Sequence, residues 1–221
     1  MVAVTSLAKS PSRRNEGAIS SRTEAAILKA AIAIIARHSL SGTTIQLVAK
    51  AANVAVGTVI LRFANKDALL AAAMQSVALE FEQARRQAID GAQGSASAAL
   101  SALIEVSLDP EVSDPAKVAV WYAFWGEARA RLVYMERVSA LDHAYQLDLE
   151  RLCRELIAAG DYQHLDAEAV AMGFAGILEW QWQEILVSGA AFDREHARQV
   201  ARAYLAGTFP REFHGHQEHR P

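Results

Sequence analysis

The 221 residues suffice for one large domain or two small ones, and a mixture of 52% hydrophobic and 21% charged residues is typical of a globular protein. The chain holds 45 alanines against 12 glycines and 5 prolines. Because alanine loses no side-chain entropy in a helix, it is the best helix former. The composition therefore predicts an all-α protein and argues against a large sheet.

The single cysteine and the lack of a long apolar run exclude further classes. Cys153 cannot form an intramolecular disulfide or supply a four-cysteine zinc site, which fits a reducing cytoplasm. No continuous apolar run reaches the roughly 18 residues that a membrane span needs, and residues 1–20 lack the apolar core of a signal peptide. We therefore expect a cytoplasmic protein with no membrane partner and with a flexible N-terminal arm over residues 1–19.

The net charge of −3 is spread unevenly along the chain. Residues 1–66 hold nine Lys or Arg and only two acids, Glu16 and Glu24, whereas residues 67–221 hold 13 basic and 23 acidic residues. A basic end on an acidic body indicates that the first third of the chain faces a polyanion. The alternative explanation is that these charges cluster by chance on a surface that contacts only water.

Apolar spacing and capping residues predict eight to ten helices and no strand. Thr44 suits an N-cap because its hydroxyl accepts an otherwise orphan backbone N–H, and proline at 115 suits a first helical turn. In chain order the expected helices span Thr23–His38, Ile45–Ala51, Val56–Phe63, Asp67–Ala88, Ala98–Leu108, Asp114–Ala130, Leu132–Ala159, Asp166–Val187 and Asp193–Ala206. A polar, disordered tail is expected over residues 208–221.

The window from Ile45 to Phe63 has the spacing of a helix-turn-helix. Small alanines at 49 and 52 let a second helix cross the first closely. Asn53 stands at the sharp turn, where a positive φ is often needed and where asparagine tolerates it better than most residues. This geometry leaves the outer face of the second helix free to enter a major groove.

The window also resembles the DNA-binding domain of tetracycline-repressor (TetR) family regulators over about residues 20–70. The resemblance rests on Thr43-Thr44-Ile45, Val48-Ala49, Ala51-Ala52-Asn53-Val54, Gly57-Thr58, Phe63 and Lys66 through Leu70. It implies a three-helix DNA-binding domain in which Thr44 and Lys66 contact phosphates. The other residues that it implies at the DNA are Arg22, Gln46, Thr58, Leu61 and Arg62.

Four residues depart from the family pattern around the second helix of this motif. Asn53 replaces a usual glycine, Ala55 a usual serine, Ile60 a frequent tyrosine, and Arg62 a usual histidine or tyrosine. The helix is therefore unusually apolar and has few groups that can hydrogen-bond to base edges. We predict more reliance on thymine methyl groups, phosphates and DNA shape.

Residues 71–207 would then form an effector-binding and dimerisation domain. The tryptophan-rich run from Val120 to Arg131 and the Trp180 region resemble the C-terminal domain of choline-responsive repressors of the betaine pathway. The predicted ligand-binding residues are Trp121, Tyr122, Trp125, Trp180 and Glu127, with Glu105 or Glu179 as further sources of charge. An aromatic box suits a quaternary ammonium through cation–π attraction, although aromatic residues at helical spacing also build ordinary cores.

The last two helices predict a hairpin that pairs with a second copy of itself as a four-helix bundle. The predicted dimer interface consists of Gly173, Gly176, Trp182, Val200 and Tyr204. A dimer places two recognition helices on successive major-groove turns of a near-palindromic operator. An effector would change their spacing by moving the helix Asp67–Ala88 as a lever, and the family expectation is repression that the ligand relieves.

Two other classes compete with this interpretation. Cys153 with His143 or His164 could form a nucleophile pair of an enzyme, but the chain has no glycine-rich phosphate loop and no nucleophile elbow. The second competing class is a helical protein-interaction module whose helix-turn-helix has lost DNA binding. We expect no enzyme and no cofactor, and a solvated tail at His214, His216 and His219 rather than a metal site.

Overall fold

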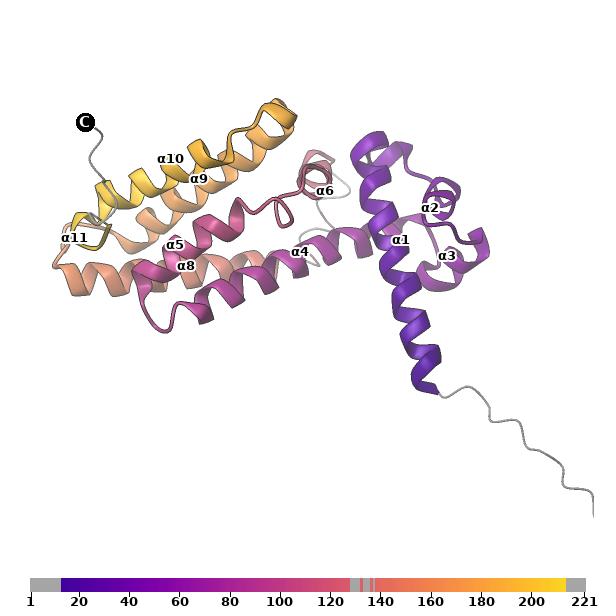
Figure 1. The fold of residues 1–221 in the computed structure, drawn as a ribbon, viewed down its shortest axis with the longest axis horizontal. Coiled ribbons are helices and arrows are strands. Elements are labelled where there is room, and N and C mark those ends of the chain that lie inside the picture. Colours follow the sequence, from indigo (N-terminus) through magenta and orange to yellow (C-terminus); the bar gives the residue numbers. More distant parts are fainter. Residues whose placement is uncertain (1–12, 128–131, 133–135, 137, 214–221) are drawn as a thin grey trace, which may run out of the picture.

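A computed structural model describes residues 13–127, 132, 136 and 138–213, and every regular element within these residues is a helix (Figure 1). The α-helices are α1 (Arg13–Gly42), α2 (Ile45–Ala51), α3 (Val56–Phe63), α4 (Lys66–Gly91), α5 (Ala96–Ser107), α6 (Pro115–Gly126), α8 (Ser139–Gly160), α9 (Ala167–Ser188), α10 (Arg194–Thr208) and α11 (Pro210–Phe213). A short 3₁₀ turn, η1 (Gly189–Ala191), joins α9 to α10.

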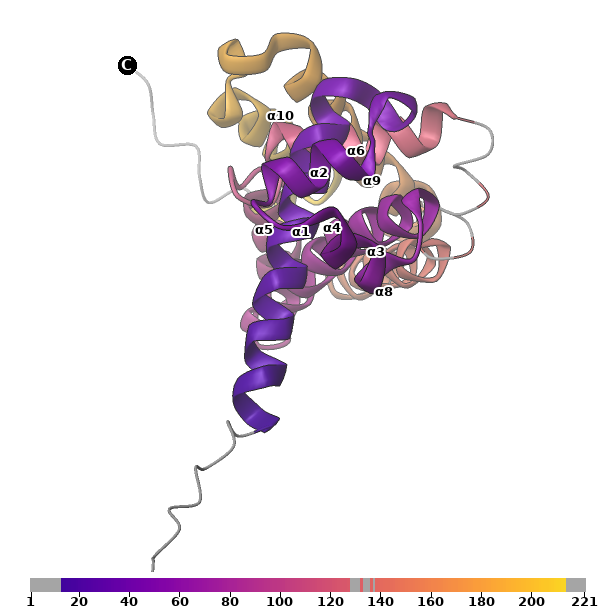
Figure 2. The same ribbon diagram turned by 90° about the vertical axis from the view of Figure 1, so that its right-hand side faces the viewer.

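The helices form two groups joined by α4 and α6. In Figure 1, α1, α2 and α3 lie at one end of the molecule, and α5, α8, α9 and α10 run side by side toward the other end. Figure 2 looks onto the first end, where α2 and α3 face the viewer. Helix α4 leads from one group into the other, and α6 lies between them.

Each group has its own hydrophobic core. The first core contains buried residues of α1 to α4, such as Ile27, Val48 and Val59, together with Val120 and Phe124 of α6. The second core is built by α5, α8, α9 and α10 around Leu103, Leu149 and Phe174. The expected division between residues 70 and 71 falls inside α4, and α6 belongs in part to the first core.

Local sequence sets most helix starts. Side-chain oxygens of Thr44, Asn65, Ser95, Asp114, Asp166 and Asp193 accept backbone N–H groups at the first turns of α2, α4, α5, α6, α9 and α10. Each cap satisfies a donor that has no partner inside its helix. The bounds of α2 and α3 match the predicted spans residue for residue.

The expected bounds at both ends of the chain are wrong. Helix α1 begins at Arg13 rather than Thr23, so residues 13–19 of the expected arm are helical, and a non-helical Ser39 interrupts it near its end. At the other end Phe209 is fully buried and α11 continues to Phe213. Packing of Phe209 against Tyr162 explains why the tail does not begin at residue 208.

Two inner bounds also differ from expectation. Helix α6 ends at Gly126 rather than Ala130, and α8 begins at Ser139 rather than Leu132. Part of α1, Ser20–Gly42, is long and apolar enough to cross a membrane by length and composition, although charged residues such as Lys29 and Arg37 interrupt its apolar sequence. Its buried residues Ile27, Ala31 and Ile35 pack in the first core, so we interpret it as a core helix.

A tight turn at Ala64 sets the direction of α4 relative to α3. Ala64 has φ 60° and ψ −49°, and the N–H of Asn65 donates to the carbonyl of Phe63 at 2.6 Å. This is a γ-turn with a positive φ at its centre, a conformation that is strained for a residue with a Cβ.

Replacing Ala64 by glycine should stabilise the protein. Relief of about 1–3 kcal/mol of backbone strain exceeds the roughly 0.5–1 kcal/mol of extra chain entropy that glycine loses on folding. We expect Ala64→Gly to raise the free energy of unfolding by about 1 kcal/mol in urea titrations. The exposed helical position Ala36 gives the matched control, since Ala36→Gly should lower it by a similar amount. A loss of stability in Ala64→Gly would contradict the assignment of strain.

Candidate nucleic-acid interface and ligand pocket

The turn between α2 and α3 is built as the sequence predicts. Thr44 caps α2 by accepting the N–H of Leu47 at 3.2 Å. Asn53 adopts φ 53°, the positive value expected at the turn. The N–H of Val54 then donates to the carbonyl of Ala49 at 3.0 Å, and buried Val59 packs α3 onto the first core. These contacts hold α3 with one face against the core and the opposite face in solvent.

The solvent face of α3 is apolar. The exposed fractions are 38% for Val56, 47% for Ile60 and 83% for Leu61. Gly57 lies on the same face, and a Cβ built there would meet nothing within 4 Å. Glycine weakens a helix relative to alanine, so packing within the chain does not account for it. The bare backbone at Gly57 instead lets another molecule approach α3 closely.

Polar residues border this face rather than occupy it. The Arg62 guanidinium donates to the Ser20 hydroxyl of α1 and lies 3.9 Å from the Glu24 carboxylate. The Lys66 ammonium donates to the carbonyl of Ser41 at 2.9 Å. Thr58 is half-buried. The remaining residues predicted at the DNA, Arg22, Thr44 and Gln46, are exposed on α1 and at the start of α2.

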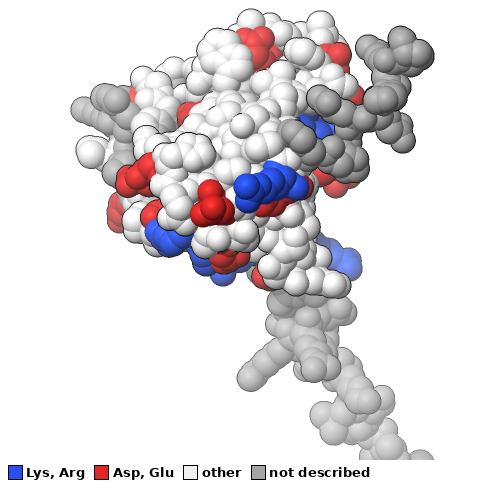
Figure 3. Space-filling view, turned by 90° about the vertical axis from the view of Figure 1, so that its left-hand side faces the viewer, with Lys and Arg blue, Asp and Glu red and all other residues white. Residues whose placement is uncertain are grey.

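The opposite end of the molecule carries both signs of charge. Figure 3 shows acidic and basic side chains next to one another on that face, with wide uncharged areas around them. Salt bridges within α8, such as Arg151 with Glu155 at 2.8 Å, contribute to this mixture. Among residues 20–66, whose side chains the structure describes, six Lys or Arg and one acid, Glu24, lie on α1 to α4, where the exposed face of α3 also lies.

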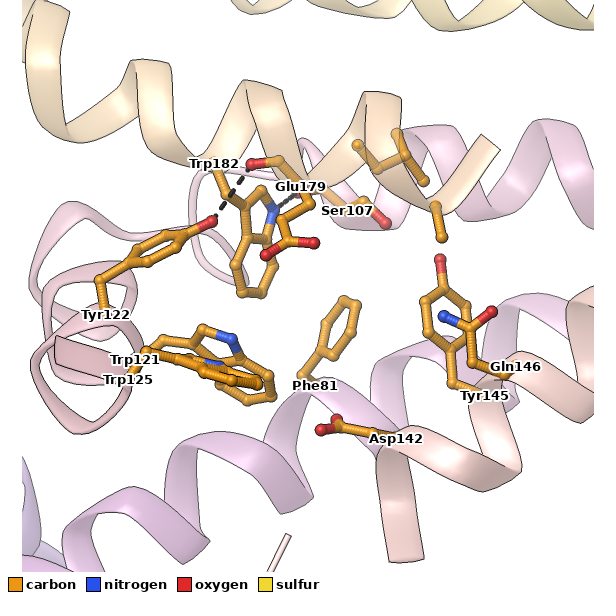
Figure 4. Close-up of a pocket in the computed structure, with 12 residues that line it drawn as sticks. Phe81, Ser107, Trp121, Tyr122, Trp125, Asp142, Tyr145, Gln146, Glu179 and Trp182 are labelled. Atoms are coloured by element: carbon orange, nitrogen blue, oxygen red, sulfur yellow. Dashed lines mark hydrogen bonds between the residues drawn. The ribbon is translucent and has the colours of Figure 1, made fainter. Parts of the chain in front are cut away.

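A cavity of about 230 Å³ opens between α4, α6, α8 and α9 (Figure 4). Aromatic side chains form most of its wall, and four helices supply them. The lining residues are Phe81, Ser107, Trp121, Tyr122, Trp125, Asp142, Tyr145, Gln146, Ala175, Leu178, Glu179 and Trp182.

The aromatic rings meet edge to face. The ring centroids of Trp121 and Trp182 are 5.9 Å apart, and those of Phe81 and Trp182 are 5.0 Å apart. Tyr145 packs edge-on against Phe81 at 6.1 Å. Trp182 is fixed by donating its indole N–H to the carbonyl of Ser107 at 2.8 Å. Packing between the rings and one buried hydrogen bond therefore fix the orientation of this wall.

The pocket also contains two carboxylates, Asp142 and Glu179, whose side chains enter from α8 and α9 (Figure 4). The Tyr122 hydroxyl donates to the backbone carbonyl of Glu179 at 3.2 Å. Burial raises the pKa of Tyr122 to about 12, with the charge of Glu179 as a smaller cause. Burial likewise raises the pKa of Tyr145 to about 12. Both phenols therefore stay neutral at physiological pH, and the titratable side chains lining the pocket are acids and phenols.

A buried arginine lies behind the pocket wall. The Arg85 guanidinium lies 4.4 Å from the ring centroid of Tyr145, donates to Glu82, and lies 3.6 Å from Asp148. Burial is the main cause that lowers the pKa of Arg85, and the nearby negative charges oppose it. Because Arg85 covers one face of Tyr145, this ring has only its other face available for a ligand.

Three of the predicted pocket residues line the cavity, and two do not. Trp121, Tyr122 and Trp125 are in its wall. Trp180, predicted in the pocket, is 58% exposed on the outer side of α9, whereas Trp182, predicted at a dimer interface, is 7% exposed and lines the cavity. Helix α9 therefore contributes Trp182 rather than Trp180 to the cavity wall. Glu127 is exposed at the end of α6 and, among the described residues, is absent from the lining.

Sequence reasoning missed the contributions of α4 and α8. Phe81, Tyr145 and Asp142 come from segments with no aromatic cluster of their own, so no local pattern identified them. Glu179 was considered only as a source of charge, together with Glu105. Glu105 instead pairs with Arg198 at 2.9 Å on the far side of α5.

The predicted dimer residues divide into two sets. Gly173 faces Tyr204 within the same chain, since a Cβ built on Gly173 would lie 2.5 Å from the Tyr204 hydroxyl. That hydroxyl donates to the carbonyl of Val170 at 3.0 Å. These two residues therefore join α9 to α10 internally. Gly176 and Val200 are exposed on these helices.

The alternative nucleophile pair is wrong. Cys153 is fully buried in the second core, and burial raises the pKa of its thiol to about 12. His143 and His164 are exposed. Among the described residues there is also no group of three or more metal-ligating side chains. The tail histidines at 214, 216 and 219 lie outside the described residues.

Comparison with known proteins identifies the family. The family model for bacterial regulatory proteins of the tetR family matches residues 27–73, and the model for the C-terminal domain of BetI-type transcriptional repressors matches residues 96–210. The chain belongs to the TetR family of transcriptional regulators. Its C-terminal domain is of the BetI type, and the family is one of regulators rather than enzymes.

Individual relatives agree with this assignment. The regulator BetI of Paraburkholderia phymatum is 30% identical over 183 residues, which covers 82% of this chain and 90% of that protein. BetI of Paraburkholderia xenovorans is 28% identical over 182 residues with the same coverage. A regulator from Pseudomonas aeruginosa PAO1 superposes with a TM-score of 0.72 at 28% identity, covering 87% of this chain and 94% of its own.

Because Cys153 is buried, we predict that its thiol reacts slowly with disulfide reagents in the folded TetR-family protein. A thiol with a pKa of about 12 is almost entirely protonated at about pH 8. We expect a disulfide reagent to label the native protein slowly, and to label it fully within the mixing time once urea unfolds it. Because the sulfur is fully buried, labelling of the native protein requires local opening of the second core, so it should accelerate in urea below the unfolding transition. Fast labelling without denaturant would contradict the buried position.

Proposed function

We propose that this TetR-family regulator is a cytoplasmic repressor that binds a near-palindromic DNA operator as a homodimer. A small organic cation, such as choline or another quaternary amine, releases it from DNA. The observation that supports DNA binding most directly is the solvent-exposed face of α3, bordered by cationic residues, in a helix-turn-helix of the tetR family.

The proposed contacts divide by chemistry. Arg22 of α1, Arg62 of α3 and Lys66 at the start of α4 are proposed to supply positive charge for phosphates. Thr44 lies at the start of α2, where backbone N–H groups attract anions. Gln46 and Thr58 are the polar side chains within reach of base edges. Leu61 is the most exposed residue of α3 and is proposed to enter the groove.

The proposed dimer uses the outer faces of α9 and α10. Met172 is 61% exposed, and Trp180 and Val187 are also exposed on α9, while Val200 is exposed on α10. With Gly176 they form an apolar surface that two copies can bury against each other around a two-fold axis. We therefore retain Gly176 and Val200 from the predicted interface and replace Trp182 by Trp180.

The proposed effector follows from the pocket's chemistry. Ring faces of Trp121, Trp125 and Trp182 attract a cation by about 0.5–2 kcal/mol each, and Asp142 and Glu179 add negative charge. A carboxylate ligand would meet repulsion from both acids.

Coupling between pocket and DNA is proposed to pass through α6 and α4. Trp121 lines the pocket and also packs against the first core, where Val120 and Phe124 of the same helix are buried. Phe81 of α4 lines the pocket, and Leu70 and Met74 earlier in α4 are buried in the first core. An effector that displaces the rings therefore moves helices on which α3 rests.

A helical interaction module without DNA binding is the alternative. It is favoured by the apolar face of α3, which could also bind another protein. Salt dependence separates the two functions, because phosphate contacts release counterions and apolar protein contacts do not.

Binding to DNA should be sequence-selective and steeply salt-dependent. We expect the full chain to bind the DNA upstream of its own gene in fluorescence anisotropy, more tightly than scrambled DNA. The logarithm of the affinity should fall linearly with the logarithm of salt concentration. Light scattering on the complex should give an even number of chains per duplex. Absence of binding at low salt would overturn the repressor proposal and favour the alternative.

Choline should release the protein from DNA, and the uncharged analogue with carbon in place of nitrogen should do so poorly. Replacing Glu179 by glutamine removes one charge at the pocket and should weaken the effect of choline about tenfold. Glu184→Gln is the matched control on the same helix, because Glu184 does not line the cavity. Equal potency of choline and its uncharged analogue would rule out a cation site.

A further inference from the structure

The outer face of α3 lacks side chains that can hydrogen-bond. Val56, Gly57, Ile60 and Leu61 are exposed and recur at the spacing of one helical face. Their side chains carry no donor or acceptor. Residues buried on the other side, Val59 and Phe63, hold this face outward. A face of this kind cannot read bases by the paired hydrogen bonds that arginine, asparagine or glutamine make.

The polar side chains of α3 do not alter this conclusion. Arg62 is directed to α1, where Ser20 accepts from it and Glu24 lies 3.9 Å away. Thr58 is half-buried one turn before Arg62, on the same flank. Positive charge therefore borders the apolar face without replacing it, an arrangement that fits a duplex with phosphates at the sides and a groove at the centre.

Only one base offers an apolar group in the major groove. Thymine presents its C5-methyl group there, whereas the other groove positions present hydrogen-bond donors and acceptors. An apolar side chain against those groups would leave them desolvated and unpaired. We propose that Leu61 and Ile60 select the operator by contacting thymine methyl groups. This inference rests on the proposed DNA-binding function and names what α3 recognises.

The experiment removes only the methyl groups. Duplexes that the full chain selects from a random pool are resynthesised with uracil in place of thymine inside the half-sites. A control duplex carries uracil only outside them. One buried CH₂ group contributes about 0.8 kcal/mol, so each contacted methyl should account for about a fourfold loss in affinity. The salt slope should not change, because the phosphates are the same.

A variant of Leu61 tests whether this side chain contacts the thymine methyl groups directly or whether uracil acts only by changing the shape of the DNA. Leu61→Ala should fold normally, since Leu61 is 83% exposed. It should bind the thymine duplex several-fold more weakly than the parent chain and respond less to uracil. Leu147→Ala is the matched control, because Leu147 is an exposed leucine of α8 in the other group of helices. If Leu61→Ala stays as sensitive to uracil as the parent chain, methyl contact by Leu61 is wrong.

The outcomes separate this inference from the function on which it rests. If the protein selects a duplex but binds it equally well when uracil replaces thymine, recognition of methyl groups is wrong. The repressor proposal would then still stand. Failure to select any duplex overturns both, and favours a protein partner for the apolar face. Loss of affinity confined to uracil within the half-sites, with a constant salt slope, supports the proposal.

Discussion

Helix α6 has two apolar faces: one is buried in the first core, and the other in a small separate cluster with α9. Val120 and Phe124 pack with α1 and α4, while Val118 packs with Trp182 and Ile185 of α9. Trp121 contacts both clusters. Because neither face can be exposed without losing apolar burial, the helix-turn-helix cannot be displaced from the second group of helices without disturbing the pocket wall. This constraint makes the two ends of the molecule one mechanical unit.

The opposite wall of the pocket is held by charge rather than by apolar contact. Arg85 of α4 is almost fully buried and is neutralised by Glu82 on its own helix and by Asp148 of α8. Removing one partner of a buried pair leaves an uncompensated charge and typically costs about 3–5 kcal/mol. Helices α4 and α8 are therefore fixed to each other beneath Tyr145. The wall formed by α6 is instead held by apolar contacts of Val118, Val120 and Phe124, and its Trp125 is 43% exposed.

The helix-turn-helix was predictable because its determinants are local. Thr44, Asn53 and the small alanines act within a few residues, and the bounds of α2 and α3 follow from them. The residues that line the pocket were only partly predictable from the sequence. Trp180 and Trp182 are two positions apart on a helix, so they must point in different directions, but the sequence does not say which one faces inward. The carbonyl of Ser107, 75 positions away in the chain, decides it by accepting from Trp182.

If the protein is the repressor proposed above, the apolar face of α3 would also affect how an effector releases it from DNA. Phosphate contacts supply most of the affinity without distinguishing sequences, so discrimination by α3 would rest on a few methyl groups, each of modest effect. A single half-site then selects weakly, whereas a two-fold dimer multiplies the discrimination of its two halves. Selection is lost as soon as one recognition helix leaves its groove. A small displacement of α6 by an effector would therefore suffice to release the operator, because neither half holds it alone.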